Sequence, residues 1–286
     1  MFDKTGLVGE QEWFYHWIIE REKCRVGNQG KLPKPWSTDK ILQAYRFCNV
    51  RREDDKVTKW IKDNWRDPFD DNRNMVFAMC VARLFNRVET LELIGFPDIP
   101  PHGFEHWLDR IRANVKERRA NGDKIWTGAY LVSTNGHSMD KIDYVLDRVL
   151  TPIFYNLRPV AANDTLQTYH HALTQYDGMG SFMAGQVIAD LKYTSCLKNA
   201  TDWWSWAPIG PGSKRGLNRY FGRNLETSIR PGLVLEELRR IQDDVVRIVG
   251  ITLPVHDVQN CCCEFDKYVR VKNCEGKPRS LYNGNR

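Results

Sequence analysis

The sequence lacks the features that mark membrane, secreted and repeat proteins. No apolar run in its 286 residues approaches the length needed to cross a bilayer, and the opening Met1-Phe2-Asp3-Lys4 lacks the apolar region of a signal peptide. There are no internal repeats and no low-complexity segments. These absences argue against a membrane partner and predict a globular protein.

Cysteine pairs at metal-binding spacing are also absent. Cys261, Cys262, Cys263 and Cys274 contain no C-x-x-C pair, and the other four of the eight cysteines are scattered along the chain. The spacing gives an iron–sulfur or zinc site little support, and it does not indicate a disulfide framework. We therefore expect a reducing cytoplasm, no metal site and no cofactor.

A strong excess of one charge is missing as well. The chain has 42 Lys and Arg against 36 Asp and Glu, a net charge of +6, so attraction to DNA has to come from local clusters. Apolar residues make up 42% of the chain and aromatic residues 12%, which supports a packed core.

Apolar residues recur at helical spacing through much of the chain, and nothing indicates a strand-rich architecture. The first such pattern is Trp13, Phe14, Trp17 and Ile18. We predict a mainly α fold with minor β, in one helical domain over residues 1–286 or in two helical lobes around a central cleft. The expected helices fill residues 10–25, 72–94 (as one or two helices), 104–115, 141–157, 164–175, 230–249 and 256–268.

Two glycine-rich turns lie between residues 177 and 216. Gly178 and Gly180 sit in a tight turn that opens a helix, where glycine permits positive φ and free N–H groups form an anion site. The second turn adds cations, since Lys214 and Arg215 follow Gly210-Pro211-Gly212. DNA phosphate is the obvious anion for both turns. The predicted DNA-backbone contacts are Gly178, Gly180, Ser181, Gly210, Gly212 and Ser213.

A dense polar block between residues 46 and 56 admits two interpretations. It is either a solvent-facing helix junction with i,i+4 ion pairs or an inward-facing network. Arg46 and Asn49 are three residues apart, which places both on one face of a helix, and an arginine fork suits a phosphate or diphosphate. Asp257, Asn260 and Glu264 likewise fall near one face of the last helix, either as helix capping or as a presented general base.

Five short blocks of the sequence carry a resemblance to a known family. They are Lys34-Pro35-Trp36 with Asp39, Tyr45 to Asp55 (YRFCNVRREDD), Thr127-Gly128-Ala129-Tyr130, Gly210 to Leu217 (GPGSKRGL), and Cys263 to Tyr268 (CEFDKY). In this order they resemble the thymine-hypermodification proteins of bacteriophages. These are the amino acid:DNA transferases, or α-glutamyl/putrescinyl-thymine pyrophosphorylases, and the related helical domain of 5-hydroxymethyluracil DNA kinases. Residues 176–190 add distant kinship to helix-hairpin-helix DNA glycosylases, so the resemblance implies a glycosylase-like helical fold.

Within this family, a kinase adds diphosphate to the hydroxymethyl group of 5-hydroxymethyluracil in phage DNA, and a transferase then displaces pyrophosphate with an amino acid or polyamine. The sequence has no G-x-x-x-x-G-K-[ST] loop, and residues 210–216 have the wrong spacing for one. We also expect the chain to leave no room for a kinase domain. The resemblance therefore implies transfer of an amino acid, with glycine as the expected donor, onto 5-(diphosphooxymethyl)uracil with release of pyrophosphate.

That reaction implies roles for particular side chains. Fixed cations would stabilise the departing pyrophosphate, and a carboxylate would take the proton of the incoming amine. The candidates for the general base are Asp202, Asp257 and Glu264. Asp202 is included because helix-hairpin-helix glycosylases keep their catalytic aspartate at about this distance after the hairpin. Ser181 stands where some of those glycosylases carry a lysine, which speaks against lyase chemistry. Tyr130 would stack on a flipped base or lie in the core. The candidates for binding the base and its diphosphate are Arg46, Asn49, Arg51, Arg52, Tyr130, Lys214, Arg215 and Lys267.

Two other functions stay open at this point. One is a DNA glycosylase for a modified pyrimidine, and the other is a non-catalytic DNA-binding helical module that serves a separate 5-hydroxymethyluracil DNA kinase. For the transferase, the expected partners are double-stranded DNA carrying modified thymine, a free amino acid and the other enzymes of the pathway. The expected location is the cytoplasm of the infected bacterial host.

Overall fold

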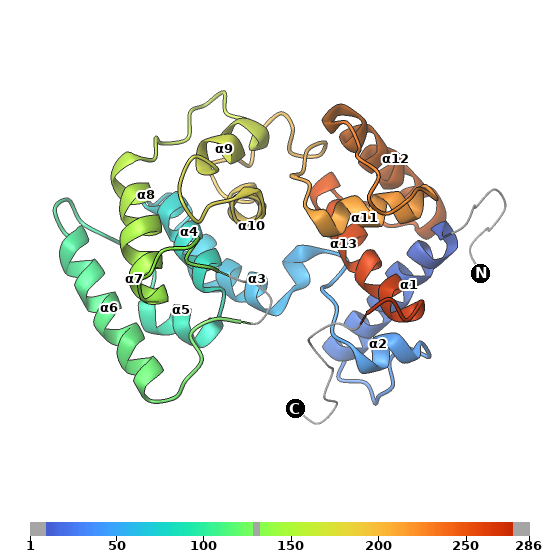
Figure 1. Ribbon diagram of the computed structural model, residues 1–286, viewed down its shortest axis with the longest axis horizontal. Helices are drawn as coiled ribbons and strands as arrows, with labels where there is room; N and C mark the ends of the chain where they lie inside the picture. Colours follow the sequence, from blue (N-terminus) through green and yellow to red (C-terminus); the bar gives the residue numbers. More distant parts are fainter. Residues whose placement is uncertain (1–9, 128–131, 277–286) are drawn as a thin grey trace. The chain divides into compact units, whose positions relative to one another are not determined.

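The computed structural model describes residues 10–127 and 132–276 (Figure 1). Helices dominate these residues and no strand occurs in them, which confirms the predicted mainly α fold. The chain divides into two compact units, unit 1 with residues 1–55 and 204–286 and unit 2 with residues 56–203. Within the described ranges, every helix is too short or too polar to serve as a transmembrane span.

Unit 1 is a cluster of helices around one central helix, α13 (Val255–Lys272). Four other helices of the unit pack against α13, and Figure 1 shows α1, α11 and α12 next to it. Each turns apolar side chains toward this centre, as expected for amphipathic helices. The other elements are α1 (Gln11–Gln29), α2 (Lys40–Ala44), the 3-10 turn η1 (Arg52–Asp54), α11 (Pro211–Tyr220) and α12 (Pro231–Val249).

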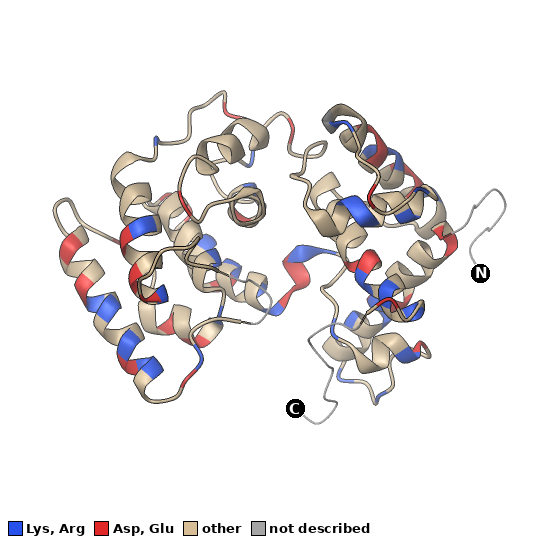
Figure 2. Cartoon of the chain, in the orientation of Figure 1, with Lys and Arg blue, Asp and Glu red and all other residues tan. Residues whose placement is uncertain are grey.

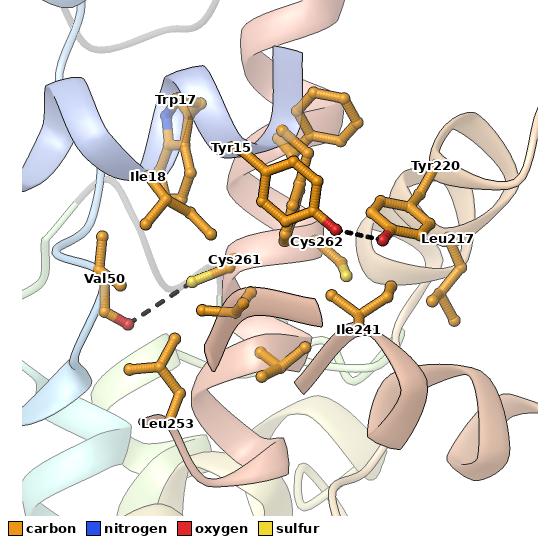
Figure 3. Packing of buried hydrophobic residues seen from close by; sticks show 14 of the residues in the cluster. Tyr15, Trp17, Ile18, Val50, Leu217, Tyr220, Ile241, Leu253, Cys261 and Cys262 are labelled. Atoms are coloured by element: carbon orange, nitrogen blue, oxygen red, sulfur yellow. Dashed lines mark hydrogen bonds between the residues drawn. The ribbon is translucent and has the colours of Figure 1, made fainter. Parts of the chain in front are cut away.

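Aromatic side chains fill the centre of unit 1 (Figure 3). Phe14 packs edge-to-face on Tyr220 and Phe265, with ring centroids 5.4 and 5.2 Å apart. The hydroxyls of Tyr15 and Tyr220 lie 2.5 Å apart in the same core, and Tyr220 also donates to Asp244 at 3.0 Å. These hydrogen bonds satisfy phenol groups that would destabilise the core if they were buried alone.

Two glycines let α11 and α13 approach closely. A Cβ on Gly216 would lie 2.0 Å from the backbone oxygen of Cys262, and a Cβ on Gly212 would lie 2.6 Å from the Sγ of Cys263. Any larger residue at Gly216 would force the two helices apart, because it would clash with the backbone of Cys262, which cannot move aside as a side chain can. Gly212 therefore has a packing role in addition to the DNA contact predicted for it.

Unit 2 is a second helical cluster with its own core. Its central helix, α4 (Met75–Phe85), is buried along nearly its whole length and packs against α10 (Ser181–Leu191). Asp190 of α10 is buried between Arg83 and Arg66, so even the charged groups of this core are internally paired. The other elements are α3 (Lys56–Ile61), η2 (Lys62–Arg66), α5 (Val88–Ile94), α6 (Phe104–Ala120), α7 (Lys141–Asp143), η3 (Tyr144–Leu150), α8 (Thr151–Asn156) and α9 (Leu166–Leu173).

The predicted helices are present, with differences at their ends. The first runs to Gln29 rather than Arg25. The segment 72–94 forms two helices, because Asn86 adopts a left-handed conformation that ends α4. Residues 141–156 are continuously helical through α7, η3 and α8. Spacing alone therefore located the long amphipathic helices.

The helix face predicted for Arg46 and Asn49 is wrong. α2 ends at Ala44, and residues 45–51 are not helical. The Asn49 backbone N–H donates to Asp55 at 2.8 Å, and the Asn49 side chain donates to the backbone oxygen of Asp54 at 2.7 Å. These local bonds replace the helical ladder. Arg46 is consequently exposed while Asn49 is buried.

Candidate functional site

One face of α13 is covered by the segment from Cys48 to Asp55. Glu264 Oε2 accepts a hydrogen bond from the Cys48 backbone N–H at 2.9 Å, and Asp257 Oδ1 accepts one from the Arg52 backbone N–H at 3.3 Å. The Arg52 guanidinium also donates to Asn260 at 3.5 Å. The three α13 side chains thus lie on one face, and all three are buried. They hold the polar block against α13, so it faces inward at Asn49 and Arg52.

Asp55 ends this segment in an unusual environment. Burial raises the pKa of Asp55 to about 6, against the opposing effects of the Asn49 N–H and the Arg52 charge. The nearby charge of Glu264 raises the pKa further. Sequence reasoning did not single out Asp55, although it lies in one of the five blocks. A carboxyl group with a pKa this close to neutrality is suited to proton transfer.

A second buried carboxylate, Asp266 of α13, gathers arginines from two helices. Arg215 Nε and Arg219 Nε of α11 each lie 3.0 Å from its oxygens, and Arg270 Nε lies 3.4 Å away. Arg219 is buried and also pairs with Glu275. The side chains of Arg215 and Arg270 are 32% and 39% exposed, so their charges are anchored at a buried acceptor yet remain open to solvent.

Further cations line unit 1 near these groups. Lys267 binds Glu264 at 3.0 Å, and its ammonium lies 4.6 Å from the centre of the Phe47 ring. Arg46 is exposed and Lys214 is half-buried, and neither side chain has a hydrogen-bond or ion-pair partner among the described residues. The Arg51 side chain has Glu22, at 3.8 Å, as its only ion-pair partner within the described ranges. Figure 2 marks the Lys and Arg of α11 and α13 in blue. Unit 1 therefore offers several cations to an anionic ligand.

The glycine turn of unit 1 starts α11. Ser213 is fully buried; its Oγ donates to the Gly210 oxygen at 3.0 Å and accepts from the Gly210 N–H at 3.1 Å. Gln259 of α13 donates to the same hydroxyl at 2.8 Å. The structure thus uses the Ser213 side chain to close the turn, which leaves the predicted DNA contact here to backbone groups and to Lys214.

The other glycine turn joins α9 to α10 in unit 2. Gly178 has φ +71°, and a Cβ there would lie 2.7 Å from the Cγ2 of Val149, so glycine is required. Asp177 accepts from the Gly178 N–H at 2.9 Å. Gly180 has φ −56° and open space around it, so its conformation does not need glycine. Ser181 follows as an exposed first residue of α10.

The predicted site also includes Asp202 and Tyr130. Asp202 belongs to unit 2, where its carboxylate accepts the backbone N–H groups of Leu166 and Gln167 at 2.7 and 3.0 Å. That contact caps the start of α9 and gives Asp202 a structural role. Tyr130 lies outside the described residues.

Asp39 links α2 to α1 and α13. Its carboxylate accepts from Tyr268 at 2.7 Å and contacts His16 at 2.9 Å, and it caps α2 through the Ile41 N–H at 2.7 Å. Burial opposes ionisation, but the hydrogen bonds from His16 and Tyr268 and from the start of α2 hold the pKa of Asp39 at about 2. The Asp39 carboxylate therefore holds the first of the five sequence blocks against the last, which contains Tyr268.

Four of the five sequence blocks thus meet on α13 in unit 1. Asp39 contacts Tyr268, Cys48 contacts Glu264, and Arg215 contacts Asp266. Of the fifth block, only Thr127 lies within the described residues. The predicted residues Gly178, Gly180, Ser181 and Asp202 belong to unit 2 instead. No group of three His, Cys, Asp or Glu side chains in the described part of the chain forms a metal-binding cluster.

The family description "5-hmdU DNA kinase, helical domain" matches residues 10–277. The chain belongs to this family. A curated relative, the 5-hmdU DNA kinase of Bacillus phage SP10, is 27% identical over 301 aligned residues, covering 91% of this chain and 45% of the relative. The chain therefore spans less than half the length of that kinase. No solved structure matches it. The relation to the kinase helical domain is confirmed, and the transferase assignment stays a prediction.

Proposed function

We propose that this protein acts in thymine hypermodification of phage DNA, as an amino acid:DNA transferase. Its family supports a substrate related to 5-hydroxymethyluracil in DNA, and the 286 residues contain no P-loop to hold a nucleotide for the kinase step. The observation that carries the proposal is the meeting of four sequence blocks on α13, where buried carboxylates lie beside partly exposed cations. This combination suits a step in which an anion departs while a proton is taken up.

The proposed step exchanges a diphosphate for an amine at the methylene carbon attached to the base. The amine nitrogen forms a bond to that carbon, the bond between carbon and diphosphate oxygen breaks, and pyrophosphate keeps the electron pair. In this proposal Lys214, Arg215 and Lys267 stabilise the charge on the departing group, with Arg46 and Arg51 as further cations. The base has to leave the stack first, at roughly a few kcal/mol, and the turn at Gly178 would hold the DNA backbone.

A carboxylate takes the surplus proton of the amine in this mechanism. Asp55 and Glu264 each keep one oxygen, Oδ2 and Oε1, without a hydrogen bond to the described residues. Asp55 is the better general base, because its pKa of about 6 lies near the working pH. Asp257 and Glu264, by contrast, accept backbone N–H groups and hold the segment that carries Asp55.

The test uses duplex DNA that carries 5-(diphosphooxymethyl)uracil. Incubation with the protein and a mixture of amino acids is followed by pyrophosphate assay and mass spectrometry of the nucleosides. We expect pyrophosphate release only when an amino acid is present, with an adduct of matching mass. Asp55→Asn should abolish most of the release, whereas Asp54→Asn, the same change one residue earlier, should keep it. Absence of release with every amino acid and polyamine tried would reject the proposal.

A DNA-binding module without catalysis is the second candidate. It is favoured by one observation: Asp257 and Glu264 already serve as acceptors for backbone N–H groups, which is a structural use of both carboxylates. The module would bind DNA with strong salt dependence and yield no modified nucleoside. Abasic sites in the treated DNA would instead indicate a glycosylase. The same mass spectrometry separates these outcomes.

A further inference from the structure

The buried carboxylate of Asp266 holds two partly exposed arginines side by side in unit 1. Arg215 Nε of α11 donates to Asp266 Oδ2 at 3.0 Å, and Arg270 Nε of α13 lies 3.4 Å from the same oxygen. Because both Nε atoms lie so close to one oxygen, the two guanidinium groups are neighbours. Arg270 lies outside the five sequence blocks, and the proposed reaction does not use it.

The close packing of α11 on α13 brings the two arginines together. Gly212 and Gly216 allow this approach, and Asp266 then contacts α11 from its place on α13. Arg270 follows Asp266 by four residues and therefore lies on the same face of α13. The pair thus joins one arginine from each helix at a single buried anchor, and the packing of the two helices fixes its position.

The terminal nitrogens of both guanidinium groups remain available to a ligand. The Nη1 and Nη2 atoms of Arg215 and Arg270 donate no hydrogen bond to the described residues. Both side chains are partly exposed, so a ligand can approach them from solvent. Arg219, the third arginine at Asp266, differs because it is buried and also pairs with Glu275. Two of the three arginines are therefore open.

Two neighbouring guanidinium groups with free terminal nitrogens match the terminal phosphate of a monoester or a diphosphate. Such a phosphate carries about two negative charges and has three acceptor oxygens, so it can accept hydrogen bonds from both arginines. A phosphate of the DNA backbone carries one charge, and a single arginine fork is enough to bind it. Arg215 and Arg270 also share the single charge of Asp266, which leaves the pair with positive charge in excess.

We infer that Arg215 and Arg270 together bind the terminal phosphate of the diphosphate leaving group, with Asp266 as the residue that positions them. The inference rests on the proposed function, which assigns Arg215 to the departing group, and it adds Arg270 as a second binding residue. Two cations fixed where negative charge develops favour the departure of pyrophosphate. The same contacts bind the released product, so the protein binds inorganic pyrophosphate by itself and is inhibited by it.

Calorimetric titration of the full chain with inorganic pyrophosphate tests the site. We expect saturable binding that is about tenfold weaker in Arg270→Gln and in Arg215→Gln, because each variant loses one guanidinium fork. Arg270→Gln should fold normally, since the side chain is partly exposed and the change removes only its ion pair with Asp266. The matched control is Arg247→Gln. It removes an exposed arginine of α12 that pairs with Asp244 on its own helix, and it should leave binding unchanged.

A double variant shows whether the two arginines bind one phosphate. In that case Arg215→Gln and Arg270→Gln together should lose less affinity than the product of the two single losses. The site is overturned if pyrophosphate does not bind, if the losses multiply fully, or if Arg270→Gln binds no more weakly than Arg247→Gln. Weaker binding of unmodified duplex DNA in Arg270→Gln, with unchanged pyrophosphate binding, would also overturn it and would indicate a contact to the DNA backbone.

Binding and turnover together separate this inference from the proposed function. Pyrophosphate binding that depends on Arg215 and Arg270, without pyrophosphate release from activated DNA with any amine, keeps the anion site and rejects the transferase. Release that Arg270→Gln leaves at the wild-type rate, with unchanged inhibition by added pyrophosphate, rejects the site and keeps the transferase.

Discussion

The two units bury their charges in different ways. In unit 2, Asp190 binds Arg83 at 2.5 Å and Arg66 at 3.5 Å, and all three side chains are at most 2% exposed. In unit 1, Asp266 is equally buried, but two of its partners, Arg215 and Arg270, are about one-third exposed. The first cluster is closed to any ligand, whereas the second presents cations to solvent from a buried anchor.

This difference separates structural from functional use of charge. A closed cluster can only stabilise the fold, because each of its buried charges is destabilising without its present partners and none is left to bind a ligand. An open cluster positions its arginines and still leaves donors for a phosphate. The sequence blocks follow the same division, since four of them meet on α13, the helix that carries Asp266. The site is therefore expected in unit 1.

The largest expected effect is the loss of the closed cluster. Asp190→Asn leaves two buried arginines without a carboxylate and should lower the free energy of unfolding by about 3–5 kcal/mol. Asp266→Asn should lower it by only about 1–2 kcal/mol, because Arg215 and Arg270 can turn to water and Arg219 keeps Glu275. Urea denaturation measures both, and hydrogen exchange shows which unit loosens. Equal losses in the two variants would contradict the distinction between closed and open clusters.

The sequence predicts the long helices of both units but not the path between Ala44 and Arg51. Periodicity works for α12 and α13, because each has one continuous apolar face and a defined start. It fails after Ala44, since bonds of Asn49 to Asp54 and Asp55 decide the backbone there. Such bonds form where a side chain bonds to a nearby backbone group, and the spacing of apolar residues does not predict where this happens.

For the candidate site, the sequence identifies the residue types but not their roles. The spacing of Asp257 and Glu264 puts them on one face, yet their acceptance of backbone N–H groups more than 200 residues away is a tertiary contact. Gly212 suggests a phosphate turn, whereas the structure adds a packing reason beside Cys263. The raised pKa of Asp55 also arises from burial, which no local pattern reveals.

Asp55 provides an effect of intermediate size with a defined pH dependence. Its pKa is raised from 3.8 to about 6, so between these values the folded state binds more protons than the unfolded state. The stability contributed by protonated Asp55 is present below pH 4 and is lost as the pH rises through 6. Asp55→Asn should therefore stabilise the protein by about 2 kcal/mol above pH 7 and by almost nothing near pH 4. Urea titrations across this range measure the difference.

The control for Asp55 is its neighbour Asp54. Asp54→Asn removes an ion pair with Arg25 at 3.3 Å and should give no gain in stability at any pH. In the proposed transferase reaction, the fall in rate on the acid side, with an apparent pKa near 6, should disappear in Asp55→Asn. A variant that is neither more stable at neutral pH nor less active would show that Asp55 is an ordinary surface carboxylate.

The smallest effect on stability should come from Lys214, and it tests whether the open charges of unit 1 act on DNA. The Lys214 side chain has no hydrogen-bond or ion-pair partner among the described residues, so Lys214→Ala should change the free energy of unfolding by less than about 0.5 kcal/mol. It should nevertheless reduce the salt dependence of DNA binding by about one counterion and slow pyrophosphate release by about tenfold. The matched control is Lys198→Ala, an exposed lysine of unit 2. If both variants weaken binding and turnover equally, the attraction to DNA comes from the net charge of the protein. The cations beside α13 then have no specific role in DNA binding.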